Sequence, residues 1–320
     1  IYEKLRKKTA FRLYSLINFA ALKLKHYFVR ISGANVREQK MLKEKVQQVP
    51  WLRSVFGFAS DPNILFITFT IPAHAKCVKV FFEMADKFER FGHVKIYETS
   101  KLATSVNLHR YDPKVGWKSY SDNWLDPLFN SGKKSFGWEE FIHIVSYTKI
   151  FDLYLSKKDI DIIKCLQRDL RMNEKILSET SGYPLSIVKK RKKEFLKRNV
   201  IVPSIHLMVR GLEGDATLFF DEKYDYNNLV KIFSELPAAT TYKLKDVISG
   251  EYLIMLHVKL SGSIFWNVIK TFNNYKEKIG LKDVYYEYRG TYSFVIDRFA
   301  DRWNEKKQHW NWSEEDFLIL

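Results

Sequence analysis

Apolar and polar residues recur along the chain with two different periods, and these periods predict two similar blocks of elements. Alternation of period two predicts strands, and spacing of three and four residues predicts amphipathic helices. Each block reads β-α-β-β-α-β, which is the order of a ferredoxin-like module. The first block has its elements at 26–31, 36–48, 51–58, 63–71, 73–91 and 93–100. The second has them at 214–220, 226–236, 240–247, 252–260, 262–279 and 283–289.

The two blocks are offset by about 189 positions and indicate an internal duplication. The segment FITFT at 66–70 matches MLHVK at 255–259. A segment rich in Trp and other aromatic residues follows each block, at 101–150 and at 291–320. Similar element order alone is common among unrelated αβ units, but a shared order, offset and aromatic tail together favour duplication.

Three helices are predicted ahead of the second block, at 157–170, 172–181 and 185–198. Ser156 is a suitable N-cap for the first of them. Gly182 and Pro184 form a tight entry to the third, because glycine permits a left-handed turn and proline suits a helix start. Helix, short helix, tight turn, basic helix and strand is the order of a winged helix-turn-helix.

If the duplication includes these helices, a basic helix should also precede the first block. Residues 1–12 are basic and fit the end of such a helix. Its two partner helices would then lie upstream of Ile1, and the first residue is not Met. We therefore expect 1–12 to be the remnant of a second recognition helix.

Composition narrows the class of partner. The 320 residues are 46% apolar and 16% aromatic, which suffices for packed cores, and the net charge is +16 with an isoelectric point near 9.5. This excess of positive charge favours polyanions, nucleic acid above all. No apolar run reaches membrane-spanning length and no signal peptide is evident, so a cytoplasmic location without membrane contact is expected. Cys77 and Cys165 are far apart and are expected to be reduced, buried residues.

The helix-turn-helix stretch resembles the Lrp/AsnC family of transcription regulators. The family's acid-hydrophobe-acid start to the first helix is matched by 159–161, and its arginine near the second helix by Arg171. Its third-helix pattern is matched by Val188 and Arg191, with Asn199 in place of a glycine. The resemblance implies a winged helix-turn-helix followed by an oligomerising ferredoxin-like module. The family's Gly-x-x-Asp turn is incomplete at 250–253, where the acid is missing, so no effector-binding residues are assigned.

Duplex DNA is the partner that this resemblance implies, with the helix at 185–198 in the major groove. Lysine and arginine residues on it would neutralise phosphates. Arg191 has a structural ion-pair role as its alternative, because it lies near the apolar stripe. The candidate DNA-binding residues are Tyr183, Ser186, Lys189, Lys190, Arg191, Lys193 and Lys197, together with Lys4, Lys7 and Lys8 of the first basic segment.

Sequence signals for catalysis and metal binding are weak. The eight histidines form no close pair with one another or with cysteine, so no metal site, cofactor or catalytic residue is predicted. The acid pairs at 139–140 and 314–315 stand beside Trp and suit packing or helix capping. Siroheme decarboxylases also resemble Lrp/AsnC proteins, and His26, His206 and His257 are the residues that a tetrapyrrole pocket would use.

The predicted fold class is α+β, a winged helix-turn-helix joined to two ferredoxin-like modules in tandem. The predicted function is DNA-binding transcription regulation without enzymatic activity, in a nucleoid-associated protein that forms homo-oligomers and takes a small-molecule effector. A siroheme-decarboxylase-like enzyme and a non-specific architectural DNA-binding protein are the alternatives. The predicted segments are 1–12 (remnant helix), 13–100 (first module), 101–150 (connecting segment), 151–203 (winged helix-turn-helix), 204–290 (second module) and 291–320 (C-terminal tail).

Overall fold

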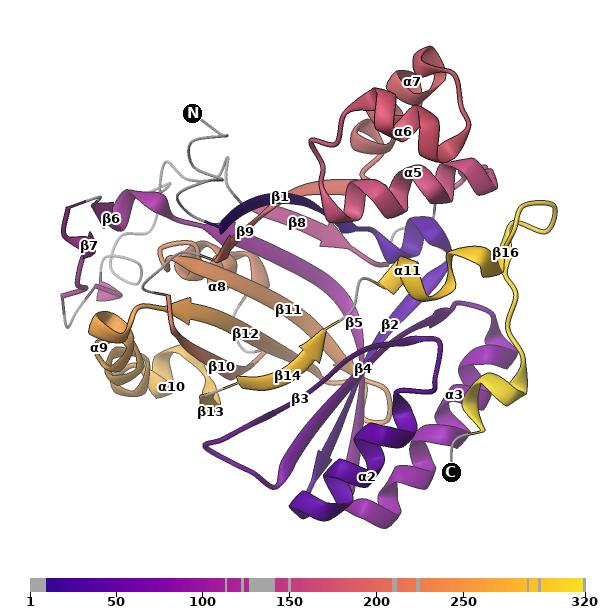
Figure 1. The fold of residues 1–320 in the computed structure, drawn as a ribbon. Helices are drawn as coiled ribbons and strands as arrows, with labels where there is room; N and C mark the ends of the chain where they lie inside the picture. Colours follow the sequence, from indigo (N-terminus) through magenta and orange to yellow (C-terminus); the bar gives the residue numbers. More distant parts are fainter. Residues whose placement is uncertain are drawn as a thin grey trace.

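Two ferredoxin-like modules and one winged helix-turn-helix make up the fold, as predicted (Figure 1). The structure is a computed structural model. It describes residues 10–112, 114–121, 124–126, 142–148, 151–208, 212–222, 225–286, 288–292 and 295–318.

The first module forms where the alternating pattern predicts it, within a few residues at each boundary. Helix α2 begins at a capping box in which Asn35 and Glu38 each accept a hydrogen bond from the other's backbone N–H. Gly92 precedes the last strand with φ of 152°, and a Cβ there would lie 2.4 Å from the Ser32 carbonyl oxygen, so only glycine fits. The elements are β2 (Leu24–Ser32), α2 (Val36–Val46), β3 (Leu52–Phe58), β4 (Ile64–Pro72), α3 (Ala75–Asp86), η2 (Lys87–Phe91) and β5 (His93–Val106).

The second module repeats the first in strand register. Phe28 pairs with Thr68 between β2 and β4, and Thr217 pairs with His257 between β10 and β12. Both members of the second pair lie 189 positions after those of the first, so the registers support the predicted offset. The elements are β10 (Gly214–Asp221), α8 (Tyr226–Phe233), β11 (Ala238–Asp246), β12 (Tyr252–Leu260), α9 (Gly262–Asn274), α10 (Lys276–Ile279) and β13 (Leu281–Tyr286).

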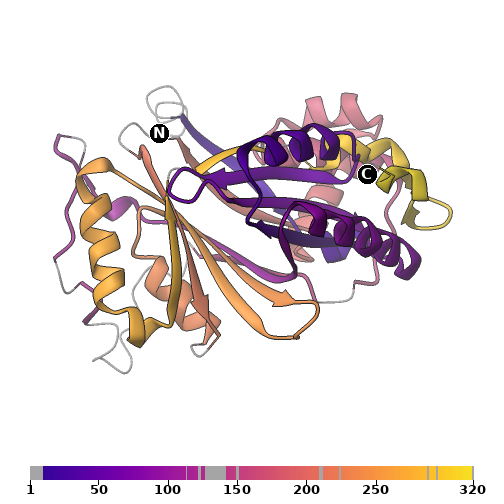
Figure 2. The same ribbon diagram turned by 90° about the horizontal axis from the view of Figure 1, so that it is seen from below.

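Each module gives the end of its last strand to the other. The second half of β5 pairs with β11, and β14 (Tyr288–Tyr292), which follows β13, pairs with β3. The strand order β13-β10-β12-β11-β5-β2-β4-β3-β14 is therefore continuous across both modules, with β8 (His143–Ser146) added beside β5. Helices α2 and α3 cover the outside of the first module, and α8 and α9 cover that of the second (Figures 1 and 2). Aromatic side chains such as Phe66 and Phe219, whose stacked rings are 5.6 Å apart, pack between the modules.

The helix-turn-helix consists of α5 (Lys157–Arg168), α6 (Glu174–Ser181) and α7 (Leu185–Lys197). Gly182 is left-handed at the end of α6, as the turn requires. The strand after α7, β9 (Ile201–Met208), pairs antiparallel with β1 (Ala10–Ile17). The prediction of helix through 12 is therefore wrong for 10–12, because β9 provides a hydrogen-bonding partner that makes them strand. Residues 1–9 lie outside the described residues.

The C-terminal tail fastens the helix-turn-helix to the first module. Trp303 Nε1 donates to the Leu155 carbonyl just before α5, and Trp310 Nε1 donates to the Leu22 carbonyl just before β2. Arg298 donates to the carbonyls of Gln47, Val49 and Leu52. The tail's elements are α11 (Val295–Phe299), η5 (Ala300–Arg302), β15 (Trp303–Asn304), β16 (His309–Trp310) and η6 (Glu314–Phe317).

The segment after β5 packs on the second module. Trp117, Tyr120 and Trp124 are buried against the core of α8 and α9, and Tyr120 Oη donates to the Glu235 carbonyl. The short elements here are η3 (Leu108–Arg110), β6 (Tyr111–Asp112) and β7 (Gly116–Trp117), and η1 (Phe19–Leu22) joins β1 to β2. Each aromatic segment therefore covers the module that does not precede it in sequence.

Two further features bear on the class of protein. Cys77 is buried and Cys165 partly buried, and neither forms a disulfide. Among the described residues, no helix has the length and apolar character needed to cross a bilayer.

Candidate functional site

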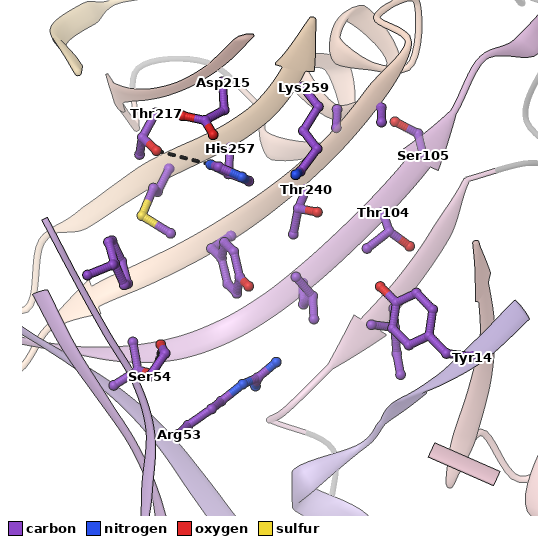
Figure 3. A pocket seen from close by; sticks show the side chains of 18 of the residues that line it. Tyr14, Arg53, Ser54, Thr104, Ser105, Asp215, Thr217, Thr240, His257 and Lys259 are labelled. Atoms are coloured by element: carbon purple, nitrogen blue, oxygen red, sulfur yellow. Dashed lines mark hydrogen bonds between the residues drawn. The ribbon is translucent and has the colours of Figure 1, made fainter. Parts of the chain in front are cut away.

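A cavity of about 470 Å³ lies between the two modules, within the usual size range of small-molecule sites. Strands β2 to β5 form one wall and β10 to β12 the other, while β1, β9 and the end of α5 close it on the side of the helix-turn-helix. Figure 3 shows polar side chains pointing into it from both walls. The lining residues are Tyr14, Leu16, His26, Phe28, Arg53, Ser54, Phe56, Thr68, Leu102, Thr104, Ser105, Val106, Arg168, Ile205, Asp215, Thr217, Ala238, Ala239, Thr240, Tyr242, Met255, His257 and Lys259.

The wall from the second module carries a histidine beside a lysine. Alternation along β12 directs both His257 and Lys259 into the cavity (Figure 3). His257 Nδ1 shares a hydrogen bond of 3.2 Å with Thr217 Oγ1 on β10. Burial, together with the nearby Lys259 charge, lowers the pKa of His257 to about 4. The ring is therefore neutral at pH 7.

The wall from the first module carries a histidine beside an arginine. His26 is 2% exposed, and its Nδ1 shares a hydrogen bond of 2.9 Å with Thr99 Oγ1. Its Nε2 has no hydrogen-bond partner. The rings of Phe19 and Phe28 lie 5.6 and 5.0 Å from the imidazole. Burial and then Arg53 lower the pKa of His26 well below its ordinary value, so this ring is also neutral at pH 7.

The cavity lining is positive and rich in hydroxyl groups. It contains the cations Arg53, Arg168 and Lys259 and a single carboxylate, Asp215. Hydroxyl pairs in and beside the wall are already hydrogen-bonded, such as Ser54 Oγ with Thr68 Oγ1 at 2.6 Å. Aromatic and aliphatic side chains fill the surface between the polar groups. An apolar cavity with a few convergent cations suits a ligand that combines an apolar body with carboxylate groups.

The helix-turn-helix contributes directly to this cavity. Arg168 at the end of α5 lines it, and the same guanidinium donates from Nε and Nη2 to Asp297 Oδ2 of the tail at 2.9 and 2.5 Å. The next strand residue on this side, Tyr14, comes from β1. The cavity is therefore closed by the same elements that hold the recognition helix in place.

The residues predicted to contact DNA divide into two groups. Ser186, Lys189, Lys190, Lys193 and Lys197 are exposed on α7, and none of these lysines forms a salt bridge with a described residue. Tyr183 and Arg191 are instead engaged within the domain.

The internal contacts of these two residues are specific. Tyr183 Oη shares a hydrogen bond of 2.5 Å with Ser156 Oγ. Arg191 donates to both carboxylate oxygens of Asp159 and to Glu194. Lys4, Lys7 and Lys8 lie outside the described residues.

The structure brings together two of the three histidines that the sequence suggested for a tetrapyrrole pocket. His26 and His257 line the same cavity, although 231 positions separate them. His206 is on β9, opposite Arg12, and its side chain lies outside the described part. Sequence reasoning missed Arg53 and Lys259. Their only signal was a polar residue in an otherwise apolar strand, which solvent exposure explains equally well.

Acidic pairs and metal ligands do not form a second site in the described part of the chain. Glu314 pairs with Lys76 at 2.8 Å, and its neighbour Asp316 caps η6 and accepts from Arg302, which are structural contacts. Residues 139–140 lie outside the described residues. No group of three His, Cys, Asp or Glu side chains among those described is placed to hold a metal ion.

Comparison with known proteins places this geometry among solved structures. No family model and no curated protein matches the sequence. The fold is similar to that of the siroheme decarboxylase NirDL, with a TM-score of 0.54, 11% identity, and coverage of 96% of this chain and 86% of that one. NirDL in complex with an iron-uroporphyrin III analogue gives a TM-score of 0.53, 8% identity, and coverage of 94% and 84%. These likenesses show that the chain has the winged helix-turn-helix and ferredoxin-like architecture of the Lrp/AsnC-like fold.

Proposed function

We propose that this protein is an enzyme that binds a carboxylate-bearing tetrapyrrole in the cavity between the modules and removes carboxyl groups from it as CO2. The observation that carries the proposal is His26, a buried histidine with an unpartnered Nε2, beside Arg53 in a positive cavity. The likeness in fold to a siroheme decarboxylase over almost the whole chain supports it.

The chemistry of the lining suits such a ligand. The flat macrocycle would pack against aromatic and aliphatic side chains, including Phe28, Phe56 and Met255. Its carboxylate arms would bind Arg53 and Lys259, since charge-assisted hydrogen bonds are the stronger ones. The single acid, Asp215, lies next to Lys259 in register, which leaves the lining positive overall.

His26 is suited to deliver a proton at the site of CO2 loss. When a carboxymethyl arm decarboxylates, the bond between the methylene and carboxylate carbons breaks and its electron pair remains on the methylene carbon. That carbon must then be protonated. A carboxylate bound beside Arg53 cancels part of the arginine charge and so raises the pKa of His26, which lets the ring accept a proton from solvent. Departure of CO2 removes this negative charge, so the pKa falls and the proton moves to the carbon.

A direct assay tests this proposal. Purified protein is mixed with siroheme and, separately, with uroporphyrin III, and the visible absorption spectrum and product mass are followed. We expect a shifted absorption band on binding and a product that has lost CO2. Unchanged spectra across a titration, with every carboxyl group retained, would refute the proposal. Arg37→Ala on the exposed part of α2 is the matched control for cavity variants such as Arg53→Ala.

DNA binding is a second candidate function, favoured by the exposed lysines of α7. Four lysines at 189, 190, 193 and 197 occupy its exposed positions without a salt bridge to a described residue. Such a face would neutralise phosphates, while Ser186 near the helix start would face base edges. The first turn of α7 contains no acidic residue to oppose this.

A salt series separates the forms of this second candidate. Mobility shifts with genomic fragments and with unrelated duplexes are compared for the natural chain and for the quadruple Lys→Ala variant of α7. Loss of binding and a shallower dependence on salt in the variant would support a DNA-binding α7. The control is Lys276→Ala with Lys278→Ala on α10, which is remote in sequence and exposed. Equal affinity for unrelated duplexes would indicate the architectural role, and no duplex binding would exclude both.

A further inference from the structure

The two cavity histidines have the same local arrangement although they come from different positions in the repeat. Each ring uses Nδ1 to bond a threonine hydroxyl: His26 bonds Thr99 and His257 bonds Thr217. With Nδ1 engaged, Nε2 is the ring nitrogen left to meet a ligand in both cases. Each ring also has its own cation, Arg53 in one case and Lys259 in the other.

Duplication alone does not explain this pair. In strand register, the position equivalent to His26 in the second module is Asp215, and the position equivalent to His257 in the first module is Thr68. Each module therefore has one histidine, on a different strand. All four of these positions line the one cavity, which means that the cavity lies across the relation between the two modules. A ligand held there meets one histidine and one cation from each wall.

We propose that His257 with Lys259 is a second proton-transfer centre, so that one bound ligand loses carboxyl groups from two of its arms. This inference rests on the proposed function. It assigns the first arm to the His26–Arg53 centre and the second arm to the His257–Lys259 centre.

The spacing of the two centres fits one ligand. Tyr242 on β11 lies 6.5 Å from the His26 ring, and Thr240 on the same strand pairs with His257. Two residues along a strand span about 7 Å. Both rings are therefore reached from neighbouring positions of a single strand, and a flat ligand lying along β11 presents different arms to the two ends.

The step at His257 balances in the same way as that at His26. The bond to the carboxylate carbon breaks, CO2 leaves, and the electron pair stays on the methylene carbon. The proton on His257 Nε2 moves to that carbon, and the ring takes its next proton from solvent. Lys259 holds the carboxylate before it leaves, and Thr217 fixes the orientation of the ring. No oxidant or reductant is needed.

Product masses from single variants test this inference. Siroheme is incubated with the natural chain, His26→Gln, His257→Gln and the double variant, with His93→Gln on the exposed start of β5 as control. We expect the natural chain and the control to release two CO2 from each siroheme. Each single variant should stop after one CO2, with the second loss slowed at least tenfold and with the remaining arm differing between the two variants. The double variant should release none while still shifting the absorption band.

Several outcomes would overturn the second centre. One is complete conversion by His257→Gln at the natural rate, and another is a natural chain that releases only one CO2. Because a buried histidine variant can fail to fold, Lys259→Met provides an independent version in which His257 remains, and it should stall at the same intermediate as His257→Gln. A natural chain that binds siroheme but releases no CO2 at all refutes the proposed function itself, which distinguishes that failure from the failure of the second centre.

Discussion

Asp159 on α5 holds Arg191 on α7 through two hydrogen bonds, of 2.7 Å from Nε and 2.6 Å from Nη2. The Asp159 side chain is 3% exposed and that of Arg191 is 18% exposed. The same carboxylate accepts from the Ser156 backbone and caps α5. Arg191 is thus the residue that fixes the recognition helix against α5, which is the structural alternative that the sequence left open.

This ion pair predicts a large cost when it is broken. Asp159→Ala leaves a largely buried guanidinium without its main partner and removes the cap of α5, so we expect a loss of about 3 kcal/mol in the free energy of unfolding. Urea unfolding followed by circular dichroism measures it. The matched control is Glu174→Gln, whose exposed pair with Lys192 is 3.4 Å long and should contribute less than about 1 kcal/mol. Equal effects of the two variants would contradict the role of Asp159.

The cavity histidines predict that stability falls in mild acid. Burial and neighbouring cations lower the pKa of both His26 and His257, the latter to about 4, whereas in the unfolded chain each has its ordinary value near 6.5. Between these values the unfolded chain binds more protons than the folded one. Stability is therefore fully present above pH 6.5 and decreases as pH falls toward 4, by up to about 1.4 kcal/mol per pH unit for each histidine.

Melting temperatures across this pH range check the acid prediction. For His257, the charged groups facing the ring are Lys259 on its own strand and Asp215 on β10. His257→Gln should flatten the dependence between pH 6.5 and 4, and Lys259→Met should weaken it. An unchanged slope in His257→Gln would show that other groups cause the acid sensitivity.

Arg53 is expected to anchor a carboxylate of the ligand. Arg53→Ala removes a charge-assisted contact worth about 1.5 to 3 kcal/mol, so the affinity for uroporphyrin III should fall by a factor of about 10 to 100. Titration monitored by absorption measures it, with Arg37→Ala as the control that keeps the natural affinity. Protoporphyrin IX has fewer carboxylates, and its affinity should change less. An equal loss for both porphyrins would point to a general distortion of the cavity.

The tail predicts a stability cost that depends on one tryptophan. Trp310 is 1% exposed and donates to the Leu22 carbonyl at 2.6 Å. Trp310→Ala should reduce the free energy of unfolding by about 3 to 5 kcal/mol, because it leaves a large void and an unpaired carbonyl. The control is Trp266→Ala on α9, where the side chain is 62% exposed, and it should change stability by less than about 0.5 kcal/mol. Comparable losses in the two variants would argue against the tail as the fastening element.

Local patterns were sufficient to predict most of the elements. Alternation in HYFVRI and YLIMLHVKL is typical of strands, and the boundaries of β2 and β12 agree with the prediction within two residues. The error at 10–12 has a physical cause. A short basic stretch can become helix or strand, and here the decision depends on β9, which lies about 190 positions later in the chain.

The sequence by itself determined the two modules, their repeat and the helix-turn-helix, because periodicity, capping residues and turn residues act over a few neighbouring positions. The cavity was decided only by tertiary structure. The exchange of β5 and β14 between modules brings His26, Arg53, His257 and Lys259 around one space. Burial there, together with cations contributed by both modules, lowers the pKa of each histidine. Neither the exchange nor the burial is visible in residue spacing, because both depend on contacts between segments far apart in the chain.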